Sequence, residues 1–176
     1  MILGLVAFAI FVRLAFHLPN ATPITALALV SSLYIGRRWA VIVPLVALFL
    51  SDLLIGFYDW RVMLAVYGSF ASIGVASMLL RKYPTKLVGA GLTLGSSLFF
   101  FLTTNFAVWA FSPWYAKSVA GLLYCYTLGL PFYRDMVLGD MIYVPLLMGV
   151  FAYGHVAAPY LRATRRELAQ AFATRV

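Results

Sequence analysis

The sequence predicts an all-α integral membrane protein with six transmembrane helices. Of its 176 residues, 64% are apolar and 10% are charged, whereas a soluble domain carries about 25% charged residues. The basic residues stand in short clusters between apolar runs, as expected for loops between membrane spans. The length is enough for roughly six spans and no additional soluble domain. These observations exclude an ordinary soluble enzyme, a disordered chain and, despite the net charge of +8, a nucleic-acid-binding domain.

Six apolar runs predict the individual helices, because roughly 20 residues cross a bilayer core at about 1.5 Å per residue. The first run looks like a retained span rather than a cleaved signal, since Arg13 interrupts it. Pro44 lies inside the third run, where neighbouring helices make a proline tolerable. The predicted spans are 2–18, 22–36, 39–57, 61–80, 86–111 and 136–158.

The segment 112–134 is rich in Trp, Tyr, Gly and Pro. Its apolar middle is interrupted by residues that usually break helices. We therefore expect an outer loop containing an interfacial or re-entrant helix between the fifth and sixth spans. The chain as a whole is expected to form a single transmembrane domain, 1–160, followed by a basic cytoplasmic tail, 161–176.

The basic residues predict the orientation. In a six-span arrangement one side holds nine of the thirteen, namely Arg37, Arg38, Arg81, Lys82, Lys86, Arg162, Arg165, Arg166 and Arg175. Basic residues accumulate on the cytoplasmic side of a membrane. The sequence therefore predicts a multi-pass protein of the cell (inner) membrane with both termini in the cytoplasm.

Motifs for catalysis are absent from the sequence. It contains no Gly-x-x-x-x-Gly-Lys-Ser/Thr phosphate loop and no His-Glu-x-x-His zinc motif. The lone Cys125 excludes an internal disulfide and every multi-cysteine metal pattern. We expect no enzymatic activity, no cofactor and no metal site, and we expect energy from ATP to come only from another protein.

Four polar residues fall at a similar predicted depth inside four different spans. Arg13, Asp52, Asn105 and Asp140 each lie about four to six residues from the outer end of their span, or roughly 6–9 Å below the outer interface. Because isolated charges inside a membrane are costly, such residues pair with each other or line a wet cavity. Both a structural ion pair and an outward-open binding pocket fit this pattern.

Aromatic and polar residues concentrate on the same outer side, more than an interfacial aromatic belt requires. Aromatic rings with a few polar groups are typical of sites for flat organic ligands. The candidate substrate-binding residues are Arg13, His17, Asn20, Asp52, Asn105, Trp109, Tyr126 and Asp140.

Small residues recur every four positions on two spans. Gly68, Ser72 and Ala76 do so on the fourth, and Gly91 and Gly95 on the fifth. Such stripes let helices approach closely in lipid. We expect them to pack within the molecule, with docking of another membrane protein as the alternative.

Several sequence stretches resemble a bacterial family of small uncharacterised membrane proteins. They are His17–Ile24 followed by Ala26–Ala28, Leu50–Gly56, Thr104–Trp109, Gly121–Phe132 and Gly139-Asp140. The size and six-span layout of that family are similar to the S components of energy-coupling-factor (ECF) vitamin transporters. That resemblance implies capture of a vitamin-like solute and a partner coupling subunit with ATPases. The Ala-x-x-x-Ala docking motif of many S components does not occur in the first span.

The leading functional hypothesis is an S-component-like uptake protein that binds a small organic solute from the external side. The first alternative is an ion-coupled secondary carrier that uses Asp52 or Asp140. The second is a non-transporting membrane scaffold subunit, in which the polar layer is only an ion pair.

Overall fold

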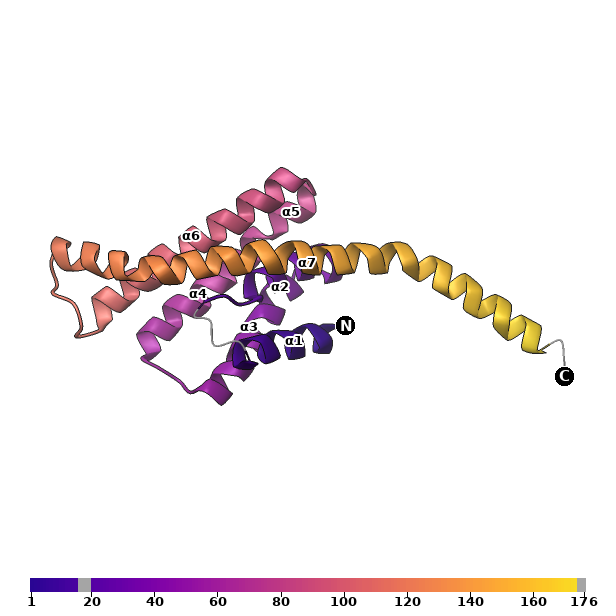
Figure 1. Ribbon diagram of the computed structural model, residues 1–176, viewed down its shortest axis with the longest axis horizontal. Helices are drawn as coiled ribbons and strands as arrows, with labels where there is room; N and C mark the ends of the chain where they lie inside the picture. The colour runs from indigo at the N-terminus through magenta and orange to yellow at the C-terminus, as the bar shows by residue number, and fades with distance from the viewer. Residues whose placement is uncertain (16–19, 174–176) are drawn as a thin grey trace.

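The computed structural model describes residues 1–15 and 20–173, and the side chains of residues 1–15 and 20–154. The described chain is helical and contains no strand. In order, its helices are α1 (Ile2–Ala15), α2 (Ile24–Val30), the π-helical η1 (Ser31–Ile35), α3 (Trp39–Ile55), α4 (Trp60–Ala76), α5 (Met78–Lys82), α6 (Lys86–Phe111) and α7 (Val119–Ala173). The predicted all-α fold is thus confirmed, with the helices gathered along part of the long α7 (Figure 1).

The short helix α2 forms the centre of the bundle. All seven of its residues are buried, and it contacts α3, α4 and α7. A helix that is apolar on every face is stable only when other helices surround it. Together α2 and η1 form an apolar helix of 12 residues, Ile24–Ile35, which is short for a lipid-exposed span. In the sequence, this segment is a mostly apolar run without a distinct polar face, as expected for a helix surrounded by other helices.

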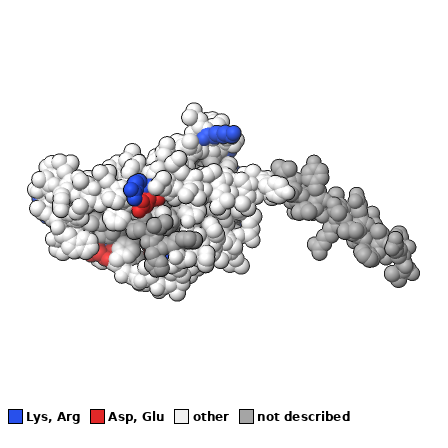
Figure 2. Space-filling model, in the orientation of Figure 1, with Lys and Arg blue, Asp and Glu red and all other residues white. Residues whose placement is uncertain are grey.

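Three helices of the described chain are long and apolar enough to cross a membrane: Trp60–Lys82, Lys86–Phe111 and Val119–Gly154. Three further apolar helices, Ile2–Ala15, Ile24–Ile35 and Trp39–Ile55, are shorter. Large apolar side chains such as Leu3, Leu54 and Ile142 are exposed on the outside of the bundle. One face of the molecule has few charged atoms, as Figure 2 shows. These properties are those of a protein that contacts lipid.

The expected interfacial or re-entrant helix does not exist as a separate element. Residues 119–134 belong to α7, which runs on without a break to Ala173 and extends beyond the other helices (Figure 1). The residues that predicted a break are accommodated inside it. Gly129 lies against Phe101 and Asn105 of α6 and allows close approach. Pro131 removes one helical hydrogen bond, a loss that membrane helices tolerate. Only 112–118 remain as a connection between α6 and α7.

The small-residue stripes face each other only loosely, because Ser72 and Ala76 of α4 and Gly91 and Gly95 of α6 line one groove between the two helices. Nothing lies within 4 Å of the position a Cβ atom would take at Gly68, Gly91 or Gly95. These glycines lie on the exposed surfaces of α4 and α6. Close packing occurs instead at Gly74, where a Cβ atom would lie 2.6 Å from the Ala40 carbonyl oxygen of α3. The repeat of small residues did not reveal which face of each helix is inside.

Candidate functional site

A cavity of about 760 Å³ opens at one end of the bundle. This is the end at which α1, α3 and α6 finish and α4 and α7 begin, which the sequence predicts to face outward. Its aromatic lining comprises Tyr58, Phe70, Phe100, Trp114, Tyr115 and Phe132, and its polar lining includes Arg13, Asn20, Thr22, Thr104, Asn105 and Cys125. Sites for small organic molecules typically measure about 300–1,000 Å³ and combine apolar walls with a few polar groups.

The structure brings some of the predicted site residues to this cavity and places others elsewhere. Arg13, Asn20 and Asn105 line it. Asp52 and Asp140 are 2% and 1% exposed and lie behind the wall. His17 lies outside the described residues.

Trp109 and Tyr126 hold the cavity wall together but are not part of its lining. The indole nitrogen of Trp109 donates to the Ala116 carbonyl at 2.9 Å, and Lys117 donates to the Trp109 carbonyl. The Tyr126 hydroxyl donates to the Leu102 carbonyl at 2.9 Å. These bonds attach the 112–118 connection and the start of α7 to α6.

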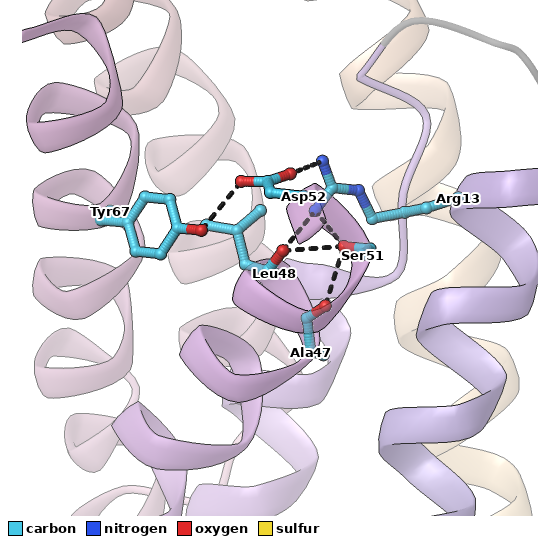
Figure 3. Close-up of polar contacts among 6 residues, drawn as sticks. All are labelled: Arg13, Ala47, Leu48, Ser51, Asp52 and Tyr67. Carbon is cyan, nitrogen blue, oxygen red and sulfur yellow. Dashed lines mark hydrogen bonds and ion pairs between the residues drawn. The ribbon is translucent and has the colours of Figure 1, made fainter. Parts of the chain in front are cut away.

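The charge of Arg13 is balanced by a buried network on α3 and α4 (Figure 3). One terminal nitrogen, Nη2, lies 2.8 Å from Asp52 Oδ1. The other, Nη1, donates to Ser51 Oγ at 2.6 Å and to the Leu48 carbonyl at 3.3 Å. Tyr67 donates its hydroxyl hydrogen to Asp52 Oδ2 at 2.8 Å. Since a guanidinium group carries five N–H bonds, Arg13 keeps uncommitted donors at the cavity wall.

Asn105 joins α6 to α7 at the opposite wall. Its amide nitrogen donates to the Phe101 carbonyl at 2.9 Å, and its side-chain oxygen faces the Cα atom of Gly129. The Cys125 thiol donates to the Asn105 backbone carbonyl at 3.4 Å. The thiol is buried and directed to backbone, an arrangement typical of a structural cysteine.

Three aromatic residues of the connecting loops belong to the lining but were not among the predicted site residues. Burial, and then the Asp52 carboxylate, raise the pKa of Tyr58 to about 12, so its hydroxyl stays neutral. Burial, and then the neighbouring Cys125, raise the pKa of Tyr115. Trp114 is 77% exposed at the cavity mouth. The sequence signal that could have identified these three residues is their position in the turns that follow α3 and α6, the helices that carry Asp52 and Asn105.

Asp140 occupies a different environment, one helical turn beyond the cavity-lining Met136 on α7. Its Oδ2 atom accepts from Ser97 Oγ at 2.8 Å. Its Oδ1 atom is buried without a hydrogen-bond partner, as is Oγ1 of Thr25. The predicted polar layer is therefore divided: Arg13 and Asp52 form one group, Asn105 lines the cavity, and Asp140 stands apart.

The cavity lining carries groups that can bind an organic molecule. In the described part of the chain, no three His, Cys, Asp or Glu side chains gather as metal ligands would. The lining instead offers rings for stacking, guanidinium N–H donors and neutral hydroxyl and amide groups.

Comparison with known proteins identifies a family. No curated protein and no solved structure matches this chain. A family model described as a family of unknown function, DUF6580, matches residues 1–161, which include the whole of the predicted transmembrane domain. The chain belongs to the DUF6580 family.

Proposed function

We propose that this protein is a membrane uptake protein that captures a small organic solute from the external side of the cell (inner) membrane. The observation that carries the proposal is the cavity of about 760 Å³, which combines aromatic walls with a few polar groups at the predicted outer end. A pocket of this kind encloses most of the surface of a small ligand.

The lining favours a flat, uncharged solute of vitamin-like size. Phe100, Phe132 and Tyr115 offer ring faces and edges. Arg13 offers N–H donors, but its positive charge is balanced by Asp52. A ligand carbonyl is therefore a better partner for Arg13 than a carboxylate, which Asp52 would repel.

We also propose that the protein acts in the way that S components do. The sequence has no phosphate loop, so a coupling subunit with ATPases would supply the energy. The small residues of α4 and α6 line a groove that is open at the surface of the molecule. The coupling subunit and the captured solute are both part of what we propose.

The experiment is a thermal-shift screen of the purified full-length protein in detergent against a panel of metabolites. A ligand present at about 100 times its Kd stabilises by about 2.7 kcal/mol, which corresponds to a rise in melting temperature of roughly 5–10 °C for a chain of this length. We expect flat uncharged ligands to produce this rise.

Variants of the lining then test the site. Asn105→Ala and Trp114→Ala should each weaken the ligand by at least about tenfold, because one loses a polar contact and the other a ring at the mouth. Thr127→Val is the matched control, since Thr127 is exposed on α7 and donates only to the Leu123 carbonyl. An unchanged affinity in both lining variants, or a panel without any stabilising ligand, contradicts the proposal.

A second candidate function is that of an ion-coupled secondary carrier, and a specific observation favours it. Asp140 is buried and has no basic partner among the described side chains, as is typical of an intramembrane coupling site. Uptake of the identified ligand into vesicles containing only this chain, driven by an imposed ion gradient, would support this function over ATPase coupling.

A further inference from the structure

Three oxygen-bearing side chains meet beneath the cavity floor. Asp140 comes from α7, Ser97 from α6 and Thr25 from α2, and all three are at least 99% buried. Ser97 Oγ donates to Asp140 Oδ2 at 2.8 Å, and Thr25 lies close enough for its hydroxyl to interact with the Asp140 carboxyl. Yet Asp140 Oδ1 and Thr25 Oγ1 each lack a hydrogen-bond partner. Two buried side-chain oxygens without partners on helices that pack together are unusual in a folded protein.

The cluster also lacks a positive charge. Two ion pairs occur among the described side chains, Arg13 with Asp52 and Arg134 with Asp135, and neither involves Asp140. A buried carboxylate without a counter-charge costs several kcal/mol, so such a group is paired with a basic residue, binds a cation or takes up a proton. The helices around Asp140 supply oxygen atoms for that role and no nitrogen cation.

Gly139, which precedes Asp140, packs against the backbone just before α2. Gly139 lies so close to Ala21 that a Cβ atom on it would stand 2.9 Å from the Ala21 Cα atom. The first helical bond of α2 joins the Leu27 amide to the Pro23 carbonyl. The Ala21 carbonyl therefore precedes the hydrogen-bond ladder of α2 and is not used by it.

We propose that Asp140, Thr25 and Ser97 form a binding site for one monovalent cation, Na⁺, directly beneath the solute cavity. Carboxylate and hydroxyl oxygens are hard ligands that suit hard cations. A single carboxylate balances a single positive charge, which favours a monovalent over a divalent ion. Na⁺ is smaller and harder than K⁺ and therefore suits carboxylate and hydroxyl oxygens better. Because α7 carries both Met136 of the cavity floor and Asp140, ion and solute would act on the same helix.

The test measures the melting temperature of the full-length protein in detergent, without any organic ligand, in NaCl, KCl or choline chloride at equal ionic strength and pH. We expect a saturable rise of a few degrees with Na⁺ and a smaller rise or none with the other salts. Because the assay contains no solute, its outcome is independent of the proposed uptake function. Equal responses to the three salts would overturn the proposal, as would a response to pH with none to Na⁺, which would assign a proton to Asp140 instead.

Substitutions of the proposed ligands test where the ion binds. Asp140→Asn should abolish the Na⁺ response, and Thr25→Val should raise the half-saturating Na⁺ concentration by at least about tenfold. Thr93→Val is the matched control, because Thr93 is also buried but donates to the Gly89 carbonyl within α6. Equilibrium dialysis with radioactive sodium provides a second readout that does not depend on melting. It should give one ion per wild-type chain and none in Asp140→Asn, and retention of the ion by that variant would overturn the assignment.

Discussion

Asp52 and Asp140 are buried to almost the same extent, 2% and 1% exposed, but their surroundings differ in kind. Both oxygens of Asp52 are used, one by Arg13 and the other by Tyr67. Asp140 has one bond, from Ser97, and an oxygen without a partner. Burial alone therefore does not distinguish these two carboxylates, whereas the completeness of their bonding does.

The paired carboxylate has a positioning role. Asp52 lies behind the cavity wall and fixes the guanidinium group of Arg13, which is 16% exposed and lines the cavity. Asp140, which has no basic partner among the described side chains, retains one carboxylate oxygen that can bind another group. Of the two aspartates that the sequence offered for ion coupling, Asp140 is therefore the one on which the proposed Na⁺ site is built.

The largest expected effect comes from breaking the complete network. Arg13→Ala leaves Asp52 buried with only its bond to Tyr67, so the free energy of unfolding should fall by about 3 kcal/mol. Unfolding in mixed detergent–SDS micelles measures the change. Asp140 offers no equivalent substitution, because no basic side chain among the described residues forms an ion pair with it.

A double variant serves as the control for that experiment. Arg13→Met with Asp52→Leu removes both charges together, and it should recover most of the lost stability because neither charge remains uncompensated. A double variant no more stable than Arg13→Ala would show that packing around Arg13 carries the effect instead of charge.

Sequence reasoning predicted the all-α class and the apolar helices because those follow from composition and hydropathy. It also placed Arg13 and Asp52 at similar depth, since depth follows from position along a span. It did not decide between Asp52 and Asp140 as the partner of Arg13. That choice depends on how helices rotate and neighbour each other, which no local pattern encodes.

The differences between prediction and structure have the same physical origin. Gly129 and Pro131 favour a break when considered alone, yet contacts with α6 stabilise a continuous α7. The stripe that includes Gly68 suggested an interior face, but Gly74, outside that stripe, makes the close contact. In both cases tertiary packing overrides a local preference. The S-component likeness and the site assignment stay predictions.

An intermediate effect is expected from disturbing the contact of α7 with the segment that precedes α2. At Gly139 a Cβ atom would meet the Ala21 backbone at 2.9 Å, so Gly139→Ala should destabilise by about 2 kcal/mol and abolish the Na⁺ response of the neighbouring Asp140. The same unfolding and salt-dependence measurements apply.

Gly149→Ala is the control on the same helix, since nothing lies within 4 Å of its Cβ position. It should leave stability unchanged or raise it by about 0.5–1 kcal/mol through helix propensity. Equal effects of the two substitutions would refute the close contact between Gly139 and Ala21 as the cause.

The smallest effect concerns the second bond to Asp52. Tyr67→Phe removes the hydroxyl that donates to Oδ2 at 2.8 Å while Arg13 keeps its bond to Oδ1. The expected loss is about 1.5 kcal/mol, the usual contribution of a hydrogen bond to a charged group. Tyr143→Phe is the control, because the Tyr143 ring packs edge-on against Phe8 and its hydroxyl lies outside the network. If Tyr67→Phe costs no more than Tyr143→Phe, then Arg13 alone satisfies Asp52, and the contrast with Asp140 rests on the guanidinium group rather than on complete bonding of both carboxylate oxygens.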